Sequence, residues 1–151
     1  MSFINAIIEI VTHRNFAVCV LAWSVAQAIK LFWYYREHRK WNWSLLVGTG
    51  GMPSGHVTLA SCFATLVGLD QGWGSPVFQV ALVLALIVMS DAWGMRQAAG
   101  RQAVVLNRVV KAIFRNGRGK PKPLKELLGH SPLEVLAGAA LGMVFAVLFS
   151  A

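Results

Sequence analysis

The stretch GGMPSGHVTLASCFATLVGLDQGWGSP, residues 50–76, decides the fold of this 151-residue chain. Its uncharged apolar part, Val57 to Leu69, is short for a helix that must cross about 30 Å of hydrocarbon at 1.5 Å of rise per residue. We therefore expect the preceding residues 53–56 (PSGH) to lie at membrane depth as well. The glycines and proline between Asp70 and Pro76 break helices, so they predict a tight turn into the next apolar segment.

Three further apolar blocks flank this stretch, at Phe16–Tyr35, Val77–Ser90 and Leu133–Phe149. Of all residues, 56% are hydrophobic and only 13% are charged. The mean hydropathy is +0.57, which is far more apolar than an ordinary soluble domain of this length. The blocks are long enough to predict four membrane-spanning helices.

Two other segments complete the predicted architecture. Residues 3–11 are apolar but too short to cross a bilayer, which indicates a surface helix or an arm that packs on a partner. Residues 97–116 alternate apolar and basic side chains, with arginines every seven positions at Arg101, Arg108 and Arg115, and predict an amphipathic helix lying on an anionic leaflet. We therefore predict an all-α integral membrane bundle of about four transmembrane helices, with both extra helices, in a single domain over residues 1–151.

Basic residues set the expected partners and orientation. The net charge is +8, but the cations flank apolar spans and are not interleaved with base-stacking aromatics, so we expect membrane lipids and no nucleic acid. The positive-inside rule places residues 96–130 and the segment around His56 on the cytoplasmic side, with both termini on the opposite side. Cys19 and Cys62 sit within apolar blocks and indicate buried hydrophobes rather than a disulfide or a zinc site, so no metal or cofactor is expected.

The candidate catalytic residues lie at two predicted helix starts, each of which contains or follows a histidine. In Pro53-Ser54-Gly55-His56, proline suits a first helical turn, glycine permits close approach of a ligand, and unpaired amides attract phosphate. His130 precedes a second start, Ser131-Pro132-Leu133-Glu134. Each start also has a purely structural interpretation, as a capped helix with an interfacial histidine, and Ser131 with Glu134 forms a good capping box. Two such starts at one membrane face could share one anion.

This motif pair resembles the type 2 phosphatidic acid phosphatase superfamily, and the overall pattern is similar to its divergent branch. That family has a Lys-x6-Arg-Pro segment, then Pro-Ser-Gly-His, then Ser-Arg-x5-His-x3-Asp. Here residues 53–56 match the second motif in full, and His130-x3-Glu134 keeps the third spacing with Glu in place of Asp. The resemblance extends from about Gln27 onward and includes residues 91–100 (DAWGMRQAAG).

The resemblance implies a metal-independent phosphatase that hydrolyses a lipid phosphate monoester, such as an isoprenoid or glycerolipid phosphate. His130 would attack phosphorus to form a phosphohistidine, Glu134 would hold the His130 ring, and His56 would protonate the departing alkoxide. A neutral imidazole oriented by a carboxylate is a competent nucleophile without metal. The alternative is a membrane protein that binds or transports a lipid phosphate or another anion on the same scaffold without turnover.

The cations that would hold the phosphate depart from the family pattern. Leu124 stands where the family has its arginine, and no Arg-Pro pair follows Lys30 at the expected distance. The expected phosphate-binding residues are Lys30, Ser54, Gly55, Arg96, Arg101 and Lys125. Lys30 lies inside an apolar span, where an ammonium needs a partner or must snorkel to the interface. Asp91, at the end of the third span, is expected to order the site rather than to catalyse.

Oligomeric state is left open. Gly138 and Gly142 are spaced as a small-residue packing face on the last span. A homodimer formed through these glycines is therefore an expectation.

Overall fold

The computed structural model describes residues 3–46, 51–114, 121–124 and 131–150, and this part of the chain is helical without strands. The elements are α1 (Phe3–Thr12), α2 (Arg14–His38), the 3-10 turn η1 (Trp43–Leu46), α3 (Gly55–Gln71), α4 (Pro76–Ser90), the π-helical turn η2 (Asp91–Met95), α5 (Arg96–Ile113) and α6 (Pro132–Leu148). The predicted all-α fold is confirmed.

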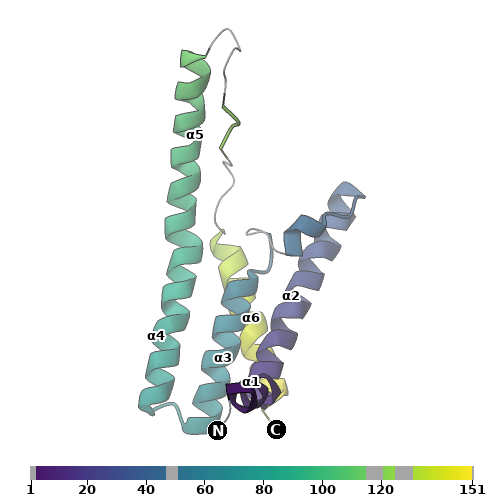
Figure 1. Cartoon of the computed structure of the whole chain (residues 1–151), viewed down its shortest axis with the longest axis vertical. Coiled ribbons are helices and arrows are strands. Elements are labelled where there is room, and N and C mark those ends of the chain that lie inside the picture. Colours follow the sequence, from purple (N-terminus) through teal and green to yellow (C-terminus); the bar gives the residue numbers. More distant parts are fainter. Residues whose placement is uncertain (1–2, 47–50, 115–120, 125–130, 151) are drawn as a thin grey trace.

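Helix α3 lies at the centre, and α2, α4 and α6 pack against it (Figure 1). One cluster joins α2, α3 and α6 through Ala22, Cys62 and Ala146, which are fully buried. A second joins α3 to α4 largely through alanines, including Ala64 and Ala85. Small side chains let neighbouring helix backbones approach closely, which is how helices associate where the surroundings are as apolar as the core.

Gly138 and Gly142 are the points where α6 lies closest to α3. A Cβ on Gly138 would stand 2.7 Å from the Ser54 carbonyl oxygen, and one on Gly142 would stand 2.8 Å from the Cys62 nitrogen and would overlap the Thr58 carbonyl. The predicted small-residue face is therefore present, but α3 of the same chain occupies it. These glycines therefore pack within the chain, and a homodimer stays a prediction.

Substituting Gly142 by alanine should destabilise the bundle strongly. The added methyl group meets backbone atoms of α3, which cannot rotate away as a flexible side chain could, so α6 must shift. We expect the free energy of unfolding, measured in mixed detergent micelles, to fall by about 3 kcal/mol. Gly94→Ala is the control because a Cβ there has no atom within 4 Å. Equal effects of the two substitutions would contradict the close packing.

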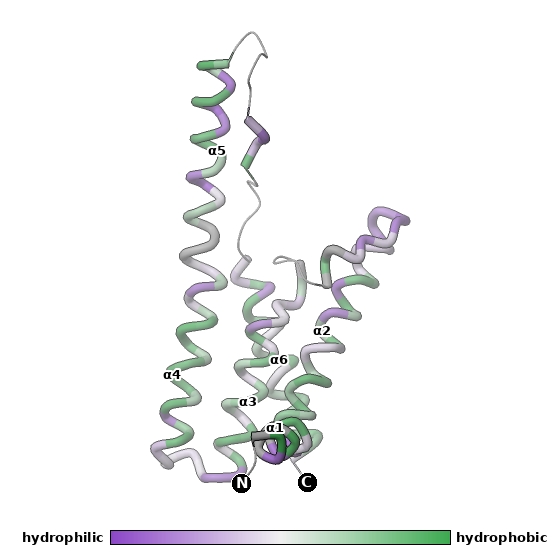
Figure 2. Tube along the Cα trace, viewed as in Figure 1, coloured by the Kyte–Doolittle hydropathy of each residue, from purple (hydrophilic) through white to green (hydrophobic). Residues whose placement is uncertain are grey.

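The amphipathic helix after the third span continues that span. Helices α4 and α5 form one continuous helix, Pro76–Ile113, through the π-helical turn η2, and α5 extends along the α4 axis beyond the ends of α2 and α3 (Figure 1). Figure 2 shows the apolar α4 giving way to a mixed, partly hydrophilic α5. The predicted helix is thus present, but it continues the axis of α4 and does not lie across the bundle axis. A single glycine costs a helix only about 1 kcal/mol, and η2 accommodates it without a break.

Both described chain ends lie at the end of the bundle with the α3–α4 turn (Figure 1). Arg14 at the start of α2 makes a 2.8 Å ion pair with Asp70 at the end of α3. The buried Asn15 donates to the other carboxylate oxygen of Asp70 at 2.6 Å. Helix α1 lies across this end with Ile4 and Ile8 exposed, as expected for a short surface helix.

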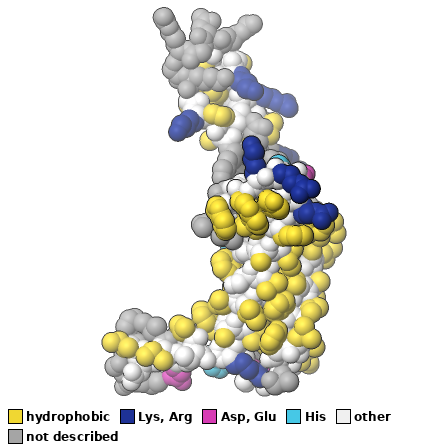
Figure 3. All heavy atoms as spheres, turned by 90° about the vertical axis from the view of Figure 1, so that its right-hand side faces the viewer, with side chains coloured by type: hydrophobic (Ala, Val, Ile, Leu, Met, Phe, Trp, Pro, Cys, Tyr) yellow, Lys and Arg dark blue, Asp and Glu magenta, His cyan; other side chains and the backbone are white. Residues whose placement is uncertain are grey.

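The exterior of the bundle is apolar. Several leucine and valine side chains on α4 and α6 are more than half exposed, among them Leu86, Leu136 and Val147. Figure 3 shows a band of hydrophobic side chains with lysines and arginines gathered above it. Among the described residues, two helices are long and apolar enough to cross a membrane, Arg14–His38 and Pro76–Ile113, and Pro132–Leu148 is a shorter apolar helix. Four crossings remain a prediction.

Candidate functional site

The two predicted helix starts lie side by side. Helices α3 and α6 both begin at the end of the bundle opposite the termini and run parallel (Figure 1). The backbone N–H of Ser54 donates to the carbonyl oxygen of Glu134 across the two starts, at 3.1 Å. The positive ends of two helix dipoles therefore converge on one place, which is an arrangement that favours an anion.

The hydroxyl of Ser54 does not cap its helix. Ser75 and Ser131, at the starts of α4 and α6, each accept a backbone N–H with their side chains, at 3.1 and 3.3 Å. Ser54 occupies the equivalent position before α3 but makes no such bond. Its oxygen is fully buried and has no hydrogen-bond partner among the described residues. Because α3 begins at Gly55, Pro53 precedes the cap rather than filling the first helical turn as expected.

This difference predicts opposite behaviour of two serine substitutions. Ser75→Ala removes a cap and should lower the free energy of unfolding by about 1 kcal/mol. Ser54→Ala removes a buried hydroxyl that caps nothing, so stability should stay within about 0.5 kcal/mol of wild type. If the hydroxyl binds phosphate, Ser54→Ala should weaken lipid phosphate binding about fivefold, measured by competition on vesicles. A stability loss equal to that of Ser75→Ala would identify Ser54 as a cap.

Lys30 points into the bundle rather than to its surface. The residue is 5% exposed, and its stem packs on Gly51, where a Cβ would stand 3.0 Å from Lys30 Cγ. Gly51 has φ +81°, in the left-handed region that glycine adopts at little cost. Lys30 also interacts electrostatically with Glu134. Lys30 of α2 is therefore brought to the paired helix starts, and snorkelling does not explain it.

Gly55 is buried against α2. A Cβ on Gly55 would stand 3.2 Å from Trp23 Nε1 and 3.6 Å from the side-chain amide carbon of Gln27. Gln27 is itself buried, one turn before Lys30 on the same face of α2. Sequence reasoning missed both Trp23 and Gln27 as neighbours of the site. The signal was there for Gln27, because a polar side chain three residues from a lysine within an apolar span shares its helix face.

His56 stands one residue beyond Gly55, and its side chain is exposed. Asp91 opens the π-helical turn η2, and the next residue, Ala92, packs on Val57 and Val135 in the first turns of α3 and α6. Asp91 is thus held at the level of the two helix starts.

Arg101 is exposed on α5. It lies nine residues farther along the continuous helix than Ala92, which is about 13 Å at 1.5 Å of rise per residue.

Three of the expected site groups lie outside the described part of the chain: His130, Lys125 and the side chain of Arg96. Leu124, at the position of the family's arginine, is described. Its backbone N–H and C=O are both held by the buried Asn107 of α5, at 2.9 Å each. Its side chain is 50% exposed. The segment just before Lys125 is therefore fixed alongside α5.

Comparison with known proteins agrees with the motif pattern. The sequence model of the Divergent PAP2 family matches residues 11–145. The chain is 36% identical over 153 residues to a protein called "Uncharacterized membrane protein YuiD" from Bacillus subtilis (strain 168), and the match covers 94% of this chain and 97% of that protein. No solved structure matches.

Proposed function

Since the chain belongs to the divergent PAP2 family, we propose that it is a membrane-embedded, metal-independent phosphatase that hydrolyses a lipid phosphate monoester. The observation that carries the proposal is the junction of α3 and α6. There, two parallel helix starts are joined by the Ser54–Glu134 hydrogen bond beside the buried Lys30. Helix dipoles and a desolvated ammonium stabilise the charge that develops on phosphoryl oxygens.

In the proposed mechanism, an imidazole nitrogen of His130 attacks phosphorus as the ester P–O bond breaks. His56, on the first turn of α3, gives a proton to the departing alkoxide. Glu134 keeps the His130 imidazole oriented and stabilises its positive charge. Water then gives a proton to His56 as its oxygen attacks the phosphohistidine, the N–P bond breaks, and inorganic phosphate leaves. Lys30, Ser54 and the amide of Gly55 would hold the phosphoryl oxygens in both steps, with Arg96, Arg101 and Lys125 as further proposed cations.

A direct assay tests this proposal. Purified protein in detergent micelles with EDTA should release phosphate from phosphatidate or an isoprenyl phosphate. Brief incubation with a 32P-labelled lipid phosphate, followed by rapid denaturation, should label the protein with an acid-labile, alkali-stable phosphohistidine. Absence of both phosphate release and label, from protein shown to be folded, would refute the hydrolytic proposal.

A second candidate function is binding or transport of a lipid phosphate without turnover. It is favoured by Leu124, which stands where the family has an arginine and whose exposed side chain is apolar. Saturable binding of phosphatidate by protein that releases no phosphate would support it. In either case we propose that this face of the bundle is cytoplasmic and that both termini lie on the other side.

A further inference from the structure

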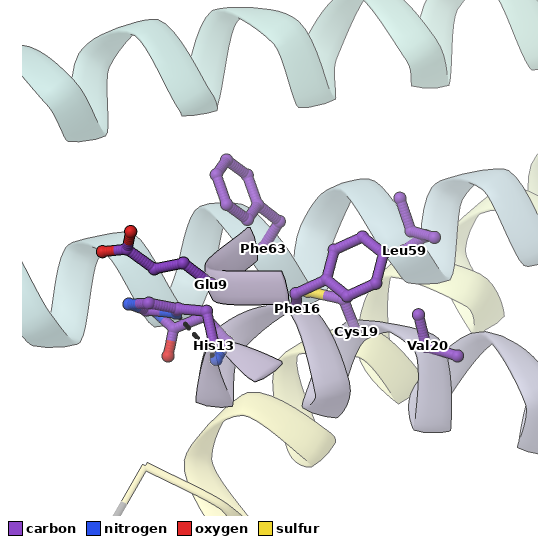
Figure 4. Close-up of a pocket in the computed structure, with 8 residues that line it drawn as sticks. Glu9, His13, Phe16, Cys19, Val20, Leu59 and Phe63 are labelled. Carbon is purple, nitrogen blue, oxygen red and sulfur yellow. Dashed lines mark hydrogen bonds between the residues drawn. The ribbon is translucent and has the colours of Figure 1, made fainter. Parts of the chain in front are cut away.

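A cavity of about 430 Å3 opens between α2 and α3. It is lined mainly by apolar side chains, with Phe16, Cys19 and Val20 from α2 and Leu59 and Phe63 from α3. Figure 4 shows Phe16, Leu59 and Phe63 projecting into the same space. The volume falls in the range of about 300 to 1,000 Å3 that is usual for pockets that hold small ligands. We call this cavity the α2–α3 groove.

One exposed face of α3 links the α2–α3 groove to the proposed site. From Gly55 to Gly68, the exposed side chains of α3 are those of His56, Leu59 and Phe63. Their spacing of three and four residues places all three on one face of the helix. From His56 to Phe63 this face descends about 10 Å, which is less than the depth of one leaflet's hydrocarbon, about 15 Å. A chain attached to a phosphate at His56 therefore reaches the groove.

The two ends of the groove differ in charge. At the end away from His56 lie Glu9 of α1 and His13, whose Nδ1 accepts the Asn15 N–H at 3.3 Å (Figure 4). The Glu9 carboxylate repels a phosphate there. Toward the other end, the exposed face of α3 reaches His56 in the first turn of the helix. A lipid phosphate thus has one favourable orientation, with its phosphate at His56 and its chain toward Glu9.

We infer that the α2–α3 groove holds one hydrocarbon chain of the lipid phosphate substrate while its phosphate lies at the paired helix starts. This inference rests on the proposed function for the identity of the phosphate end. It implies that the substrate carries at least one chain long enough to pass Leu59 and Phe63. It also implies that the protein selects phosphates on long chains over water-soluble phosphate monoesters.

Photo-crosslinking on the intact protein tests the groove without requiring turnover. Nanodiscs containing phosphatidate with a diazirine on its acyl chain should give adducts on Phe16–Val20 and Leu59–Phe63, and unlabelled phosphatidate should compete. Leu59→Trp and Phe63→Trp should fill the groove and remove these adducts. Val144→Trp, on the exposed face of α6, should leave them unchanged. Equal labelling by a diazirine phosphatidylcholine would overturn the inference, since the groove would then accept any bilayer lipid.

A kinetic measurement separates failure of the groove from failure of the proposed hydrolysis. In Leu59→Trp and Phe63→Trp, the ratio of kcat/KM for phosphatidate to kcat/KM for p-nitrophenyl phosphate should fall about tenfold. An unchanged ratio in active protein, with no groove adducts, would refute binding of the lipid chain in the groove and would leave the proposed phosphatase activity intact. Groove adducts that unlabelled phosphatidate removes, in protein that hydrolyses neither substrate, would support binding of the lipid chain in the groove and refute the proposed phosphatase activity.

Discussion

His130→Ala should abolish phosphate release from a lipid phosphate and should also abolish labelling of the protein by 32P. The reason is that His130 is the proposed nucleophile, so its loss removes the step that breaks the ester bond. His56→Ala should slow release from an alkyl phosphate by about 100- to 10,000-fold, the usual contribution of general acid catalysis. The two histidines therefore have similar effects on a lipid substrate but for different reasons.

The leaving group distinguishes these two roles. p-Nitrophenolate departs without a proton, so the defect of His56→Ala should be much smaller on p-nitrophenyl phosphate, whereas His130→Ala should stay inactive on both substrates. His38→Ala is the matched control, because His38 is exposed at the end of α2 and stacks on Tyr34 at 4.2 Å. If His56→Ala were equally defective on both substrates, the general acid assignment would be wrong.

Local chemistry explains why several helix ends could be predicted. Ser131 was expected to cap the last span with Pro132 at the first helical position, and the structure has this cap, with Ser131 accepting the Glu134 N–H. Pro76, in contrast, was assigned to the turn before the third block, and in the structure it is the first residue of α4 behind the Ser75 cap. Caps depend on a few adjacent residues, so sequence alone carries the information.

Features that depend on a distant partner were harder to predict. Gly138 and Gly142 mark a packing face, but periodicity does not say whether a second copy or α3 fills it. Ser54 looked like Ser131 in sequence, yet its hydroxyl is buried without capping α3, and α6 packs on the Ser54 backbone at Gly138. The continuous helix through Gly94 was also missed, since a π-helical turn leaves no local signal as strong as proline's.

The sequence identified Lys30 as a candidate site residue but did not predict the direction of its side chain. Its position in an apolar span indicated either a buried partner or a path to the interface, and both are compatible with a long flexible side chain. The buried orientation of Lys30 depends on Gly51, which makes room for the aliphatic part of the side chain. It also depends on Glu134, about a hundred residues away in sequence. The contacts of Lys30 with Gly51 and Glu134 form only when α2, α3 and α6 pack together. No local sequence pattern predicts them.

Lys30→Met should reduce kcat/KM for a lipid phosphate by about 100- to 1,000-fold, the scale observed when one preorganised transition-state contact is removed. Methionine keeps most of the stem that packs on Gly51 but lacks the ammonium, so the phosphoryl oxygens would face the Glu134 carboxylate without this cation. Lys30→Arg retains the charge but is bulkier beside Gly51, and we expect an intermediate rate. Lys111→Met, on the exposed side of α5, is the control for loss of one positive charge and should be close to wild type.

Stability and binding measurements decide whether Lys30 serves the substrate or only neutralises Glu134. Lys30→Met removes an ammonium that attracts the Glu134 carboxylate and should lower the free energy of unfolding by about 2 kcal/mol. Adding Glu134→Gln removes that charge, so the double variant should recover most of the stability. If Lys30 only balances the charge of Glu134, the double variant should bind phosphatidate as tightly as Glu134→Gln alone. If Lys30 binds phosphate, the double variant should be stable but should bind phosphatidate more weakly than Glu134→Gln, and this is the result we expect, because neither methionine nor glutamine supplies the positive charge that the phosphoryl oxygens require.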